Sequence, residues 1–323
     1  MQPIISRSLS ALIFPAAILF HLCLCEVGYG QTFLVTSYNN AAVEKFDLST
    51  GQFLGHMIAP GLGGLSGPHD LIYGLDKNLL VAGGDGSVKK YDYLTGAYLG
   101  DFVTTGSGGL NNAIGMEFGA DGNLYVVSNG TNSVKRFNGT TGAYIGDFVS
   151  TGSGGLFIPM DLKFASTGDL LVSAIGTSEI KRYNGLTGAY IGNFVTSGSG
   201  GLYSPNGMTF GPDGNLYVAS YQTDSVKKYN GVTGAFISNF GGSLSGVYDV
   251  LFAHDGSLIV TQQSPVNNAK RFDGGTGSLL TTYSSPNINP SFILLAVPEP
   301  SILSMLGGTG VSICLLLLRR RKR

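Results

Sequence analysis

The body of the chain is built from short apolar runs of three to six residues, each bounded by Gly, Asn, Asp or Pro. In one representative stretch, the runs 208–210, 216–220, 226–229 and 235–240 are separated by a Pro-Asp-Gly turn, a polar loop and an Asn-Gly turn. Such runs are too short for helices. Asp-Gly or Asn-Gly between β-forming residues is typical of hairpins, because Gly adopts positive φ without steric cost. The pattern therefore predicts four antiparallel strands in this stretch.

This four-strand unit recurs six times along the chain. A Thr-Gly pair marks the same turn of each unit, with spacings of 45, 46, 46, 46 and 43 residues, at Thr50, Thr95, Thr141, Thr187, Thr233 and Thr276. Four short strands in about 45 residues is the spacing of a β-propeller blade. The sequence therefore predicts an all-β fold, a six-bladed β-propeller of four-stranded antiparallel blades over residues 31–296.

The two ends of the repeat region predict how the ring closes. Residues 33–37 match the second strand of a unit, whereas residues 292–296 match the first strand. The last strand is therefore expected to complete the blade begun by residues 33–58, which removes two open sheet edges. The innermost strands of the six blades are expected near 70–74, 115–119, 161–165, 207–211, 249–253 and 292–296.

Composition agrees with a large β-rich core and excludes several classes of protein. The 323 residues include 50 Gly, 18 Phe and 16 Tyr, and 43% of them are hydrophobic. Glycine without a three-residue period excludes a collagen, and the apolar content excludes a disordered chain. The formal net charge of −1 gives no support for nucleic-acid binding. The 3 Cys all lie outside residues 31–296, so that segment holds neither a disulfide nor a Cys-based site.

Residues 1–30 have the pattern of a secretory signal peptide. Arg7 precedes a long apolar run, and Gly28 and Gly30 place small residues at the two positions that signal peptidase reads. Cleavage is therefore expected before Gln31, with the body of the chain exported.

The C-terminal residues 297–323 have three parts. Pro298-Glu299-Pro300 is followed by the uncharged stretch 301–318 and then by five consecutive basic residues. At a rise of about 1.5 Å per residue this stretch can just span a bilayer core, with its basic end cytoplasmic. The combination resembles the PEP-CTERM sorting signal. That resemblance implies processing by an exosortase-type membrane enzyme, transient or lasting membrane attachment, and delivery to the cell surface or extracellular matrix of a Gram-negative bacterium.

The repeated pattern Asp-Gly-Asn-Leu-Tyr-Val, Ser-Val-Lys-Arg-Tyr-Asn and Thr-Gly is similar to NHL-type repeats over residues 33–296. It also resembles the six-bladed propellers that include SMP-30/gluconolactonase-like and streptogramin-lyase-like proteins. The gluconolactonase-like resemblance implies a metal at the Asn of Pro-Asn-Gly, which Asn206 matches. Tyr248 and Ser66 stand where that family has acidic residues. Only one of the three metal-site positions of that family is matched. This favours a non-enzymatic binding or structural module, with a divalent-metal-dependent lactonase or lyase as the alternative.

Candidate chemistry gathers where the innermost strands begin, at the mouth of the central channel. Asp70, Asp161 and Asp249 share one repeat position in alternate blades, which stand about 120° apart in a six-fold ring. With Asn206 they form a candidate Ca²⁺ or Mg²⁺ site, because these cations prefer oxygen ligands. His69 is the only candidate general base. The favoured alternative is that each Asp caps a turn or binds loop amides in its own blade.

Three further residues are candidate ligand-binding side chains at this mouth. Glu117 and Lys163 lie two residues further along their strands than the shared Asp position, hence on the same face. Tyr248 immediately precedes Asp249. Together they would line the same channel.

Basic pairs recur on the third strand of five blades, at Lys89-Lys90, Lys135-Arg136, Lys181-Arg182, Lys227-Lys228 and Lys270-Arg271. They indicate either ion pairing on the strand face or a contact surface for acidic exopolysaccharide. Residues 31–297 hold thirteen Lys or Arg against eighteen Asp or Glu, a net charge of −5. The Gly-Ser-Gly-Gly-Leu segments at 106–110, 152–156 and 198–202 are followed by neither a helix nor a Lys, so they predict connectors between blades rather than phosphate-binding loops.

Overall fold

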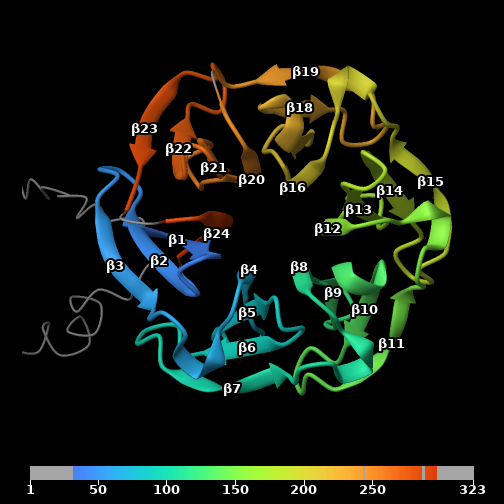
Figure 1. The fold of residues 1–323 in the computed structure, drawn as a ribbon. Helices are drawn as coiled ribbons and strands as arrows, with labels where there is room; N and C mark the ends of the chain where they lie inside the picture. Colours follow the sequence, from blue (N-terminus) through green and yellow to red (C-terminus); the bar gives the residue numbers. More distant parts are fainter. Residues whose placement is uncertain (1–31, 243, 286–287, 297–323) are drawn as a thin grey trace, which may run out of the picture.

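The structure is a computed structural model that describes residues 32–242, 244–285 and 288–296. These residues form six four-stranded sheets arranged as a ring (Figure 1). Neighbouring strands in every sheet pair antiparallel, so each sheet is one propeller blade. The predicted six-bladed β-propeller is confirmed.

The blades follow one another in chain order. Blade 1 is β24-β1-β2-β3, and blades 2 to 6 are β4–β7, β8–β11, β12–β15, β16–β19 and β20–β23. The innermost strands are β4 (Pro68–Tyr73), β8 (Ala113–Phe118), β12 (Pro159–Phe164), β16 (Pro205–Phe210), β20 (Val247–Phe252) and β24 (Pro290–Leu295). Each begins two residues before the position expected from the sequence.

The other three layers of strands surround this inner ring. The second strands are β1 (Thr32–Ser37), β5 (Leu79–Gly83), β9 (Leu124–Ser128), β13 (Leu170–Ala174), β17 (Leu216–Ser220) and β21 (Leu258–Gln262). The third strands are β2 (Ala42–Asp47), β6 (Val88–Tyr91), β10 (Ser133–Phe137), β14 (Glu179–Tyr183), β18 (Ser225–Tyr229) and β22 (Asn268–Phe272). The outer strands are β3 (Phe53–Ile58), β7 (Tyr98–Val103), β11 (Tyr144–Val149), β15 (Tyr190–Val195), β19 (Phe236–Phe240) and β23 (Leu279–Tyr283).

The ring is closed by pairing the last strand with the first. β24 runs antiparallel to β1, with Phe33 opposite Leu295 and Val35 opposite Ile293. The Phe292 amide also donates a 2.9 Å hydrogen bond to the Thr36 hydroxyl. The closure expected from the register of the repeat ends is therefore confirmed, and it removes the two sheet edges that an open ring would expose.

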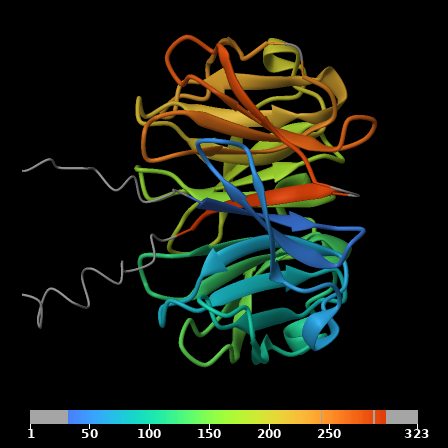
Figure 2. The same ribbon diagram turned by 90° about the vertical axis from the view of Figure 1, so that its left-hand side faces the viewer.

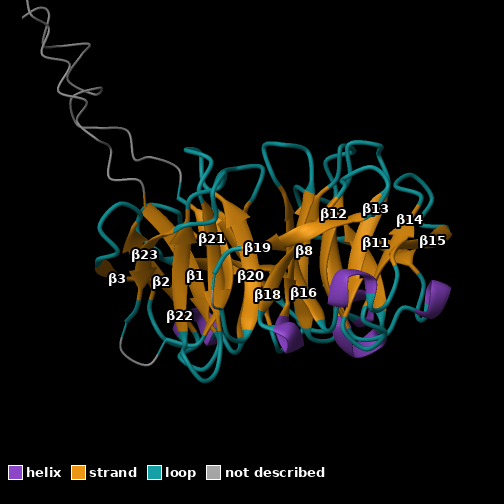
Figure 3. Cartoon of the chain, turned by 90° about the horizontal axis from the view of Figure 1, so that it is seen from above, coloured by secondary structure: helices purple, strands orange, loops and turns teal. Residues whose placement is uncertain are grey.

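The two faces of the ring differ. The connectors from an outer strand to the next innermost strand carry 3₁₀ turns on one face, here the 3₁₀ face (Figures 2 and 3), at η1 (Leu62–Gly64), η2 (Ser107–Gly109), η4 (Ser153–Gly155) and η5 (Ser199–Gly201). The opposite face, here the chain-end face, carries the tight hairpins of each blade. The described chain ends also meet there, because the Ala296 amide bonds the Thr32 carbonyl at 2.9 Å.

The Gly-rich connectors are ordered turns attached to the following blade. The Tyr183 and Tyr229 hydroxyls each donate a 2.8 Å hydrogen bond to the connector carbonyls of Ser153 and Ser199. Gly108 has φ +59°, and a Cβ there would overlap the ring of Tyr144. The connector interpretation is confirmed, and glycine is required where the chain passes over the aromatic ring.

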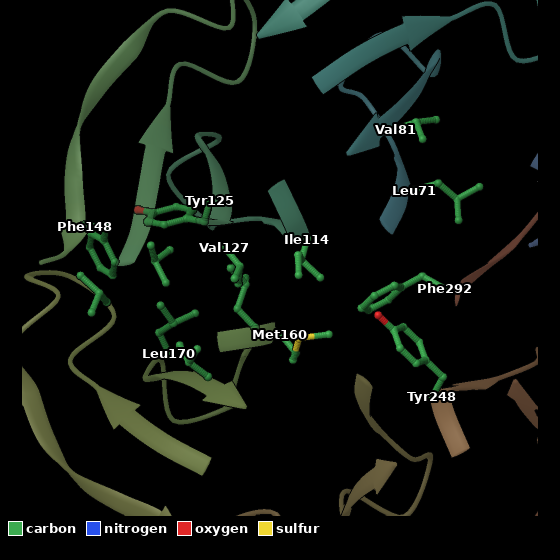
Figure 4. Packing of buried hydrophobic residues seen from close by; sticks show 14 of the residues in the cluster. Leu71, Val81, Ile114, Tyr125, Val127, Phe148, Met160, Leu170, Tyr248 and Phe292 are labelled. Atoms are coloured by element: carbon green, nitrogen blue, oxygen red, sulfur yellow. The ribbon is translucent and has the colours of Figure 1, made fainter. Parts of the chain in front are cut away.

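The apolar core continues across the blade boundaries and reaches the axis of the ring. Ile114, Met160, Tyr248 and Phe292 come from four different blades and point toward one another in Figure 4. No helix within the described ranges is long and apolar enough to cross a membrane. The expected signal peptide 1–30 and the sorting segment 297–323 lie outside the described residues.

Candidate functional site

The candidate residues of the channel lie in irregular starts of the innermost strands. In β4, Pro68 pairs with Gly83 but Leu71 pairs with Val81, so the register shifts across His69 and Asp70. The same shift occurs in β12 and β16. A bulge of this kind redirects side chains. Here it lets the carboxylate of one blade reach backbone amides of the next.

The three repeated aspartates connect neighbouring blades. Both oxygens of Asp70 accept 2.7 Å bonds, Oδ1 from its own neighbour Leu71 and Oδ2 from the Met116 amide of blade 3. Asp161 repeats this arrangement, with Oδ2 accepting from the Met208 amide of blade 5 at 2.8 Å. The favoured expectation from the sequence is that each Asp caps a turn or binds amides of its own blade. Only one oxygen of each of these carboxylates does so, and the other accepts from an amide of the next blade.

Asp249 makes the same connection at the point where the ring closes. Its Oδ2 accepts a 3.0 Å bond from the Ile293 amide of β24. At this repeat position the intervening blades 3 and 5 carry Gly115 and Gly207. A Cβ on Gly207 would overlap the Asp249 carboxylate, and one on Gly115 would lie 2.7 Å from the Asp161 Cα. The alternation of Asp and Gly therefore has a steric cause: each glycine leaves room for the carboxylate of the following blade.

Lys163 is the cation of this carboxylate cluster. Its Nζ lies 3.2 Å from Asp161 Oδ1. The attraction of Asp161, Glu117, Asp70 and Asp249 outweighs burial and raises the Lys163 pKa above its ordinary value. Glu117 Oε2 accepts a 2.9 Å bond from the Phe164 amide, which links blade 3 to blade 4. The structure therefore brings together five of the residues singled out in the sequence.

Burial changes the protonation of the cluster. Desolvation raises the pKa of Asp70 to about 7 and that of Glu117 to about 7, against the opposing attraction of Lys163. Desolvation and the neighbouring Asp161 and Asp70 raise the Asp249 pKa well above its ordinary value. One ammonium among four buried carboxylates leaves excess negative charge, so the folded protein holds protons that the unfolded chain would release.

These residues do not fit a Ca²⁺ or Mg²⁺ ion. Both oxygens of Asp70 and Asp161 accept N–H donors, and an ammonium already lies beside Asp161. A hard cation needs six or more free oxygen ligands or waters. Within the described ranges, no group of three or more His, Cys, Asp or Glu side chains is placed to hold a metal ion.

His69 lies in an apolar setting beside the channel. Burial lowers its pKa to about 4, against the opposing effect of a hydrogen bond with Asn112. Its Nδ1 has no partner, and its ring centroid lies 5.1 Å from that of Tyr38. Because the Asp70 oxygens accept backbone amides, the structure gives the two side chains different partners and does not orient them as an acid–base pair.

The two other mouth residues contribute to packing. The Tyr248 ring meets Phe292 edge-on at 5.8 Å, and burial raises the Tyr248 pKa. Asn206 is buried, and its backbone carbonyl accepts a 2.7 Å bond from the Ser173 hydroxyl. The mouth is thus filled mainly by apolar side chains.

Most members of the repeated basic pairs form ion pairs within their own blades, whereas Lys227 Nζ donates to the neutral Asn239 Oδ1 at 3.0 Å. In four of the five pairs the first member is buried; Lys135, for example, is 4% exposed, and its Nζ lies 2.7 Å from Asp147 Oδ1. The second member pairs with an Asp of the hairpin on the chain-end face, as Lys228 does with Asp213 at 2.8 Å. Ion pairing on the strand face is therefore confirmed, and it leaves few of these charges for an acidic polymer.

Grooves between blades are the feature that the sequence did not reveal. Three lie at equivalent places on the chain-end side of the ring, with cavity volumes of about 240, 280 and 500 Å³. Each is lined by a hairpin Asp and the second basic residue of the pair, namely Asp76 and Lys90, Asp121 and Arg136, and Asp213 and Lys228. The repeat alignment contains this pairing, but only the packing of adjacent blades shows the space beside it.

Comparisons with known proteins support the fold and give no information on the function. No family model and no curated protein matches the sequence. A chain in a crystal structure of a nidogen/laminin complex is similar with a TM-score of 0.67 and 13% identity, over 84% of this chain and 99% of that chain. A protein of unknown function from Bacteroides caccae gives a TM-score of 0.64 and 14% identity, over 83% and 99% of the two chains.

Proposed function

We propose that this protein is exported and acts as a non-enzymatic binding or structural module at the cell surface or in the extracellular matrix. The observation that carries the proposal is the use of the channel carboxylates. Asp70, Asp161 and Asp249 bond amides across blade boundaries, and Lys163 compensates their charge. Carboxylates that hold neighbouring blades together stabilise the ring. This is the role expected of a structural scaffold, not of a catalytic site.

The outside of the ring supports a contact role. Exposed apolar side chains recur on the outer strand of every blade, at Leu54, Tyr98, Leu99, Tyr144, Ile145, Tyr190, Ile191, Phe236, Ile237, Leu279 and Leu280. Scattered exposed hydrophobics are normal, but repetition of the same surface around a ring offers many equivalent contacts to an extended partner. The propeller is therefore suited to binding polymers of the cell envelope.

Export is inferred from the sequence of the two chain ends. The signal peptide 1–30, the propeller 31–296 and the PEP-CTERM-like segment 297–323 form one consistent export design, with an exosortase-type enzyme as the processing partner. A segment that follows Ala296 starts on the chain-end face, so attachment there would turn the 3₁₀ face outward.

Fractionation of intact cells with mass spectrometry of both mature termini tests the proposal. We expect the protein in the surface or matrix fraction, with an N-terminus at Gln31 and with the residues after Pro298-Glu299-Pro300 removed or retained in the membrane. Recovery from the cytoplasm with residues 1–30 intact would refute export and, with it, the proposed role.

A further inference from the structure

The groove between blades 3 and 4 has a cavity volume of about 280 Å³. Asp121 and Arg136 of blade 3 form one wall, and Phe164 and Leu186 of blade 4 form the other. Leu186 is 87% exposed, so it forms an apolar lip at the entrance. The groove therefore joins a charged pair, with donors and acceptors, to an apolar surface.

Arg136 differs from the two arginines at the same repeat position. In blade 4, Arg182 Nε donates to Asp169 Oδ2 at 2.7 Å. In blade 6, Arg271 Nε donates to the Ser257 hydroxyl at 2.8 Å and Nη1 to the Leu48 carbonyl at 2.9 Å. Arg136 Nε is buried and has no acceptor.

The remaining contacts of Arg136 include a hydrogen bond with the Tyr125 side chain, but its contact with the hairpin carboxylate is long. Its Nη1 lies 4.0 Å from Asp121 Oδ2, and its guanidinium lies over the Phe148 ring at 5.8 Å. Asp121 instead accepts shorter bonds from the Asn123 side chain at 2.7 Å and the Tyr125 hydroxyl at 3.0 Å. A buried donor without an acceptor is costly. The buried Nε is out of reach of a ligand, but the Arg136 side chain is 32% exposed, so the rest of the guanidinium is available in the groove without a close carboxylate partner.

We propose that this groove binds a neutral sugar residue of an envelope polysaccharide, an inference that rests on the proposed surface role. A hydroxyl of the ligand accepts from a terminal nitrogen of the Arg136 guanidinium, and another donates to Asp121, whose side chain is 41% exposed. The apolar face of the sugar ring lies against Leu186 and Phe164. An anionic ligand is disfavoured because Asp121 lines the same cavity and the body carries net negative charge.

The repeat extends this site around the ring. The grooves between blades 2 and 3 and between blades 5 and 6 also present a hairpin Asp with a basic residue, but there Lys90 and Lys228 are closely ion-paired with Asp76 and Asp213. These two grooves are weaker sites than the one beside Arg136, but several sites on one rigid ring still raise the effective concentration of a polymer at each of them. A long polysaccharide is therefore expected to bind more tightly than a single sugar.

Affinity electrophoresis of the full chain, in a detergent without a sugar headgroup, tests the proposal. The gels contain dextran or galactomannan as neutral polymers, or alginate as an acidic one. We expect at least one neutral polymer to retard the protein. Arg136→Met should weaken this binding about tenfold, the effect of one hydrogen bond to a charged group. Arg182→Met is the matched control, because its guanidinium is already paired with Asp169.

Melting temperatures of the variants distinguish a loss of binding from a loss of folding. Arg136→Met should leave Tm unchanged, whereas Arg182→Met should lower Tm and keep polymer binding. Leu186→Ala, on a side chain that is almost fully exposed, should weaken binding without any effect on folding. Retardation by alginate only, unchanged binding of Arg136→Met and Leu186→Ala, or no retardation by either neutral polymer would overturn the groove assignment. A protein that is found at the cell surface but fails this assay would leave the proposed function standing.

Discussion

Gly207→Ala tests whether the Asp and Gly alternation holds the ring together. The added methyl would overlap the Asp249 carboxylate, which accepts the Ile293 amide at the closure of the ring. Loss of that acceptor leaves a buried N–H, at a cost of about 1 to 3 kcal/mol. Overpacking adds about 1 to 3 kcal/mol. We therefore expect a loss of about 2 to 6 kcal/mol in the free energy of unfolding.

Thermal melting followed by circular dichroism, with urea unfolding beside it, measures this loss. Gly192→Ala is the matched control: it lies in an outer strand, and a Cβ there meets nothing within 4 Å. A drop in Tm of about 2 to 4 °C per kcal/mol is expected for Gly207→Ala in a domain of this size, and none for the control.

A double-mutant cycle refines the test. In the Asp249→Ala background the carboxylate is absent, so adding Gly207→Ala should cost much less than it does in the wild type. Equal stability of Gly207→Ala and wild type, or equal cost in both backgrounds, would refute the steric explanation.

Three further outcomes are expected. Because burial raises the Asp70 pKa to about 7 from an ordinary 3.8, the contribution of Asp70 to stability is greatest below pH 3.8 and falls as pH rises to 7. Asp70→Asn should flatten the curve of Tm against pH over that interval, and an unchanged curve would contradict the shift. Ca²⁺ or Mg²⁺ should leave Tm unaltered, since a ligand of the folded state would raise it. A rise lost in Asp161→Ala would instead favour the lactonase or lyase alternative. Phe137→Tyr should give blade 3 the connector bond that Tyr183 and Tyr229 make, adding about 0.5 to 1.5 kcal/mol in urea unfolding.

The blade number and ring closure could be predicted because they depend on local signals. Asp-Gly and Asn-Gly turns define hairpins within a few residues, and the Thr-Gly spacing counts the units. The register of residues 33–37 and 292–296 then determines which strands meet. None of these steps requires knowledge of how two blades pack.

The candidate site was predictable in position but not in its contacts. Asp70, Asp161 and Asp249 share a register in the sequence, and the structure brings them together with Lys163. Their partners are amides of Met116, Met208 and Ile293, which become reachable through the register shift at the strand starts. Such a shift is produced by tertiary packing, so the repeat pattern alone could not distinguish a metal ligand from a link between blades.

The strand that joins β1 is also the last one made, which affects how the protein matures. Until residues 290–295 emerge from the ribosome, β1 has one unsatisfied backbone edge and the ring stays open between blade 6 and blade 1. An intermediate of this kind can pair with other chains. A chaperone that shields β1 would protect it, and a substitution that prevents β24 from pairing with β1 would leave the whole ring open.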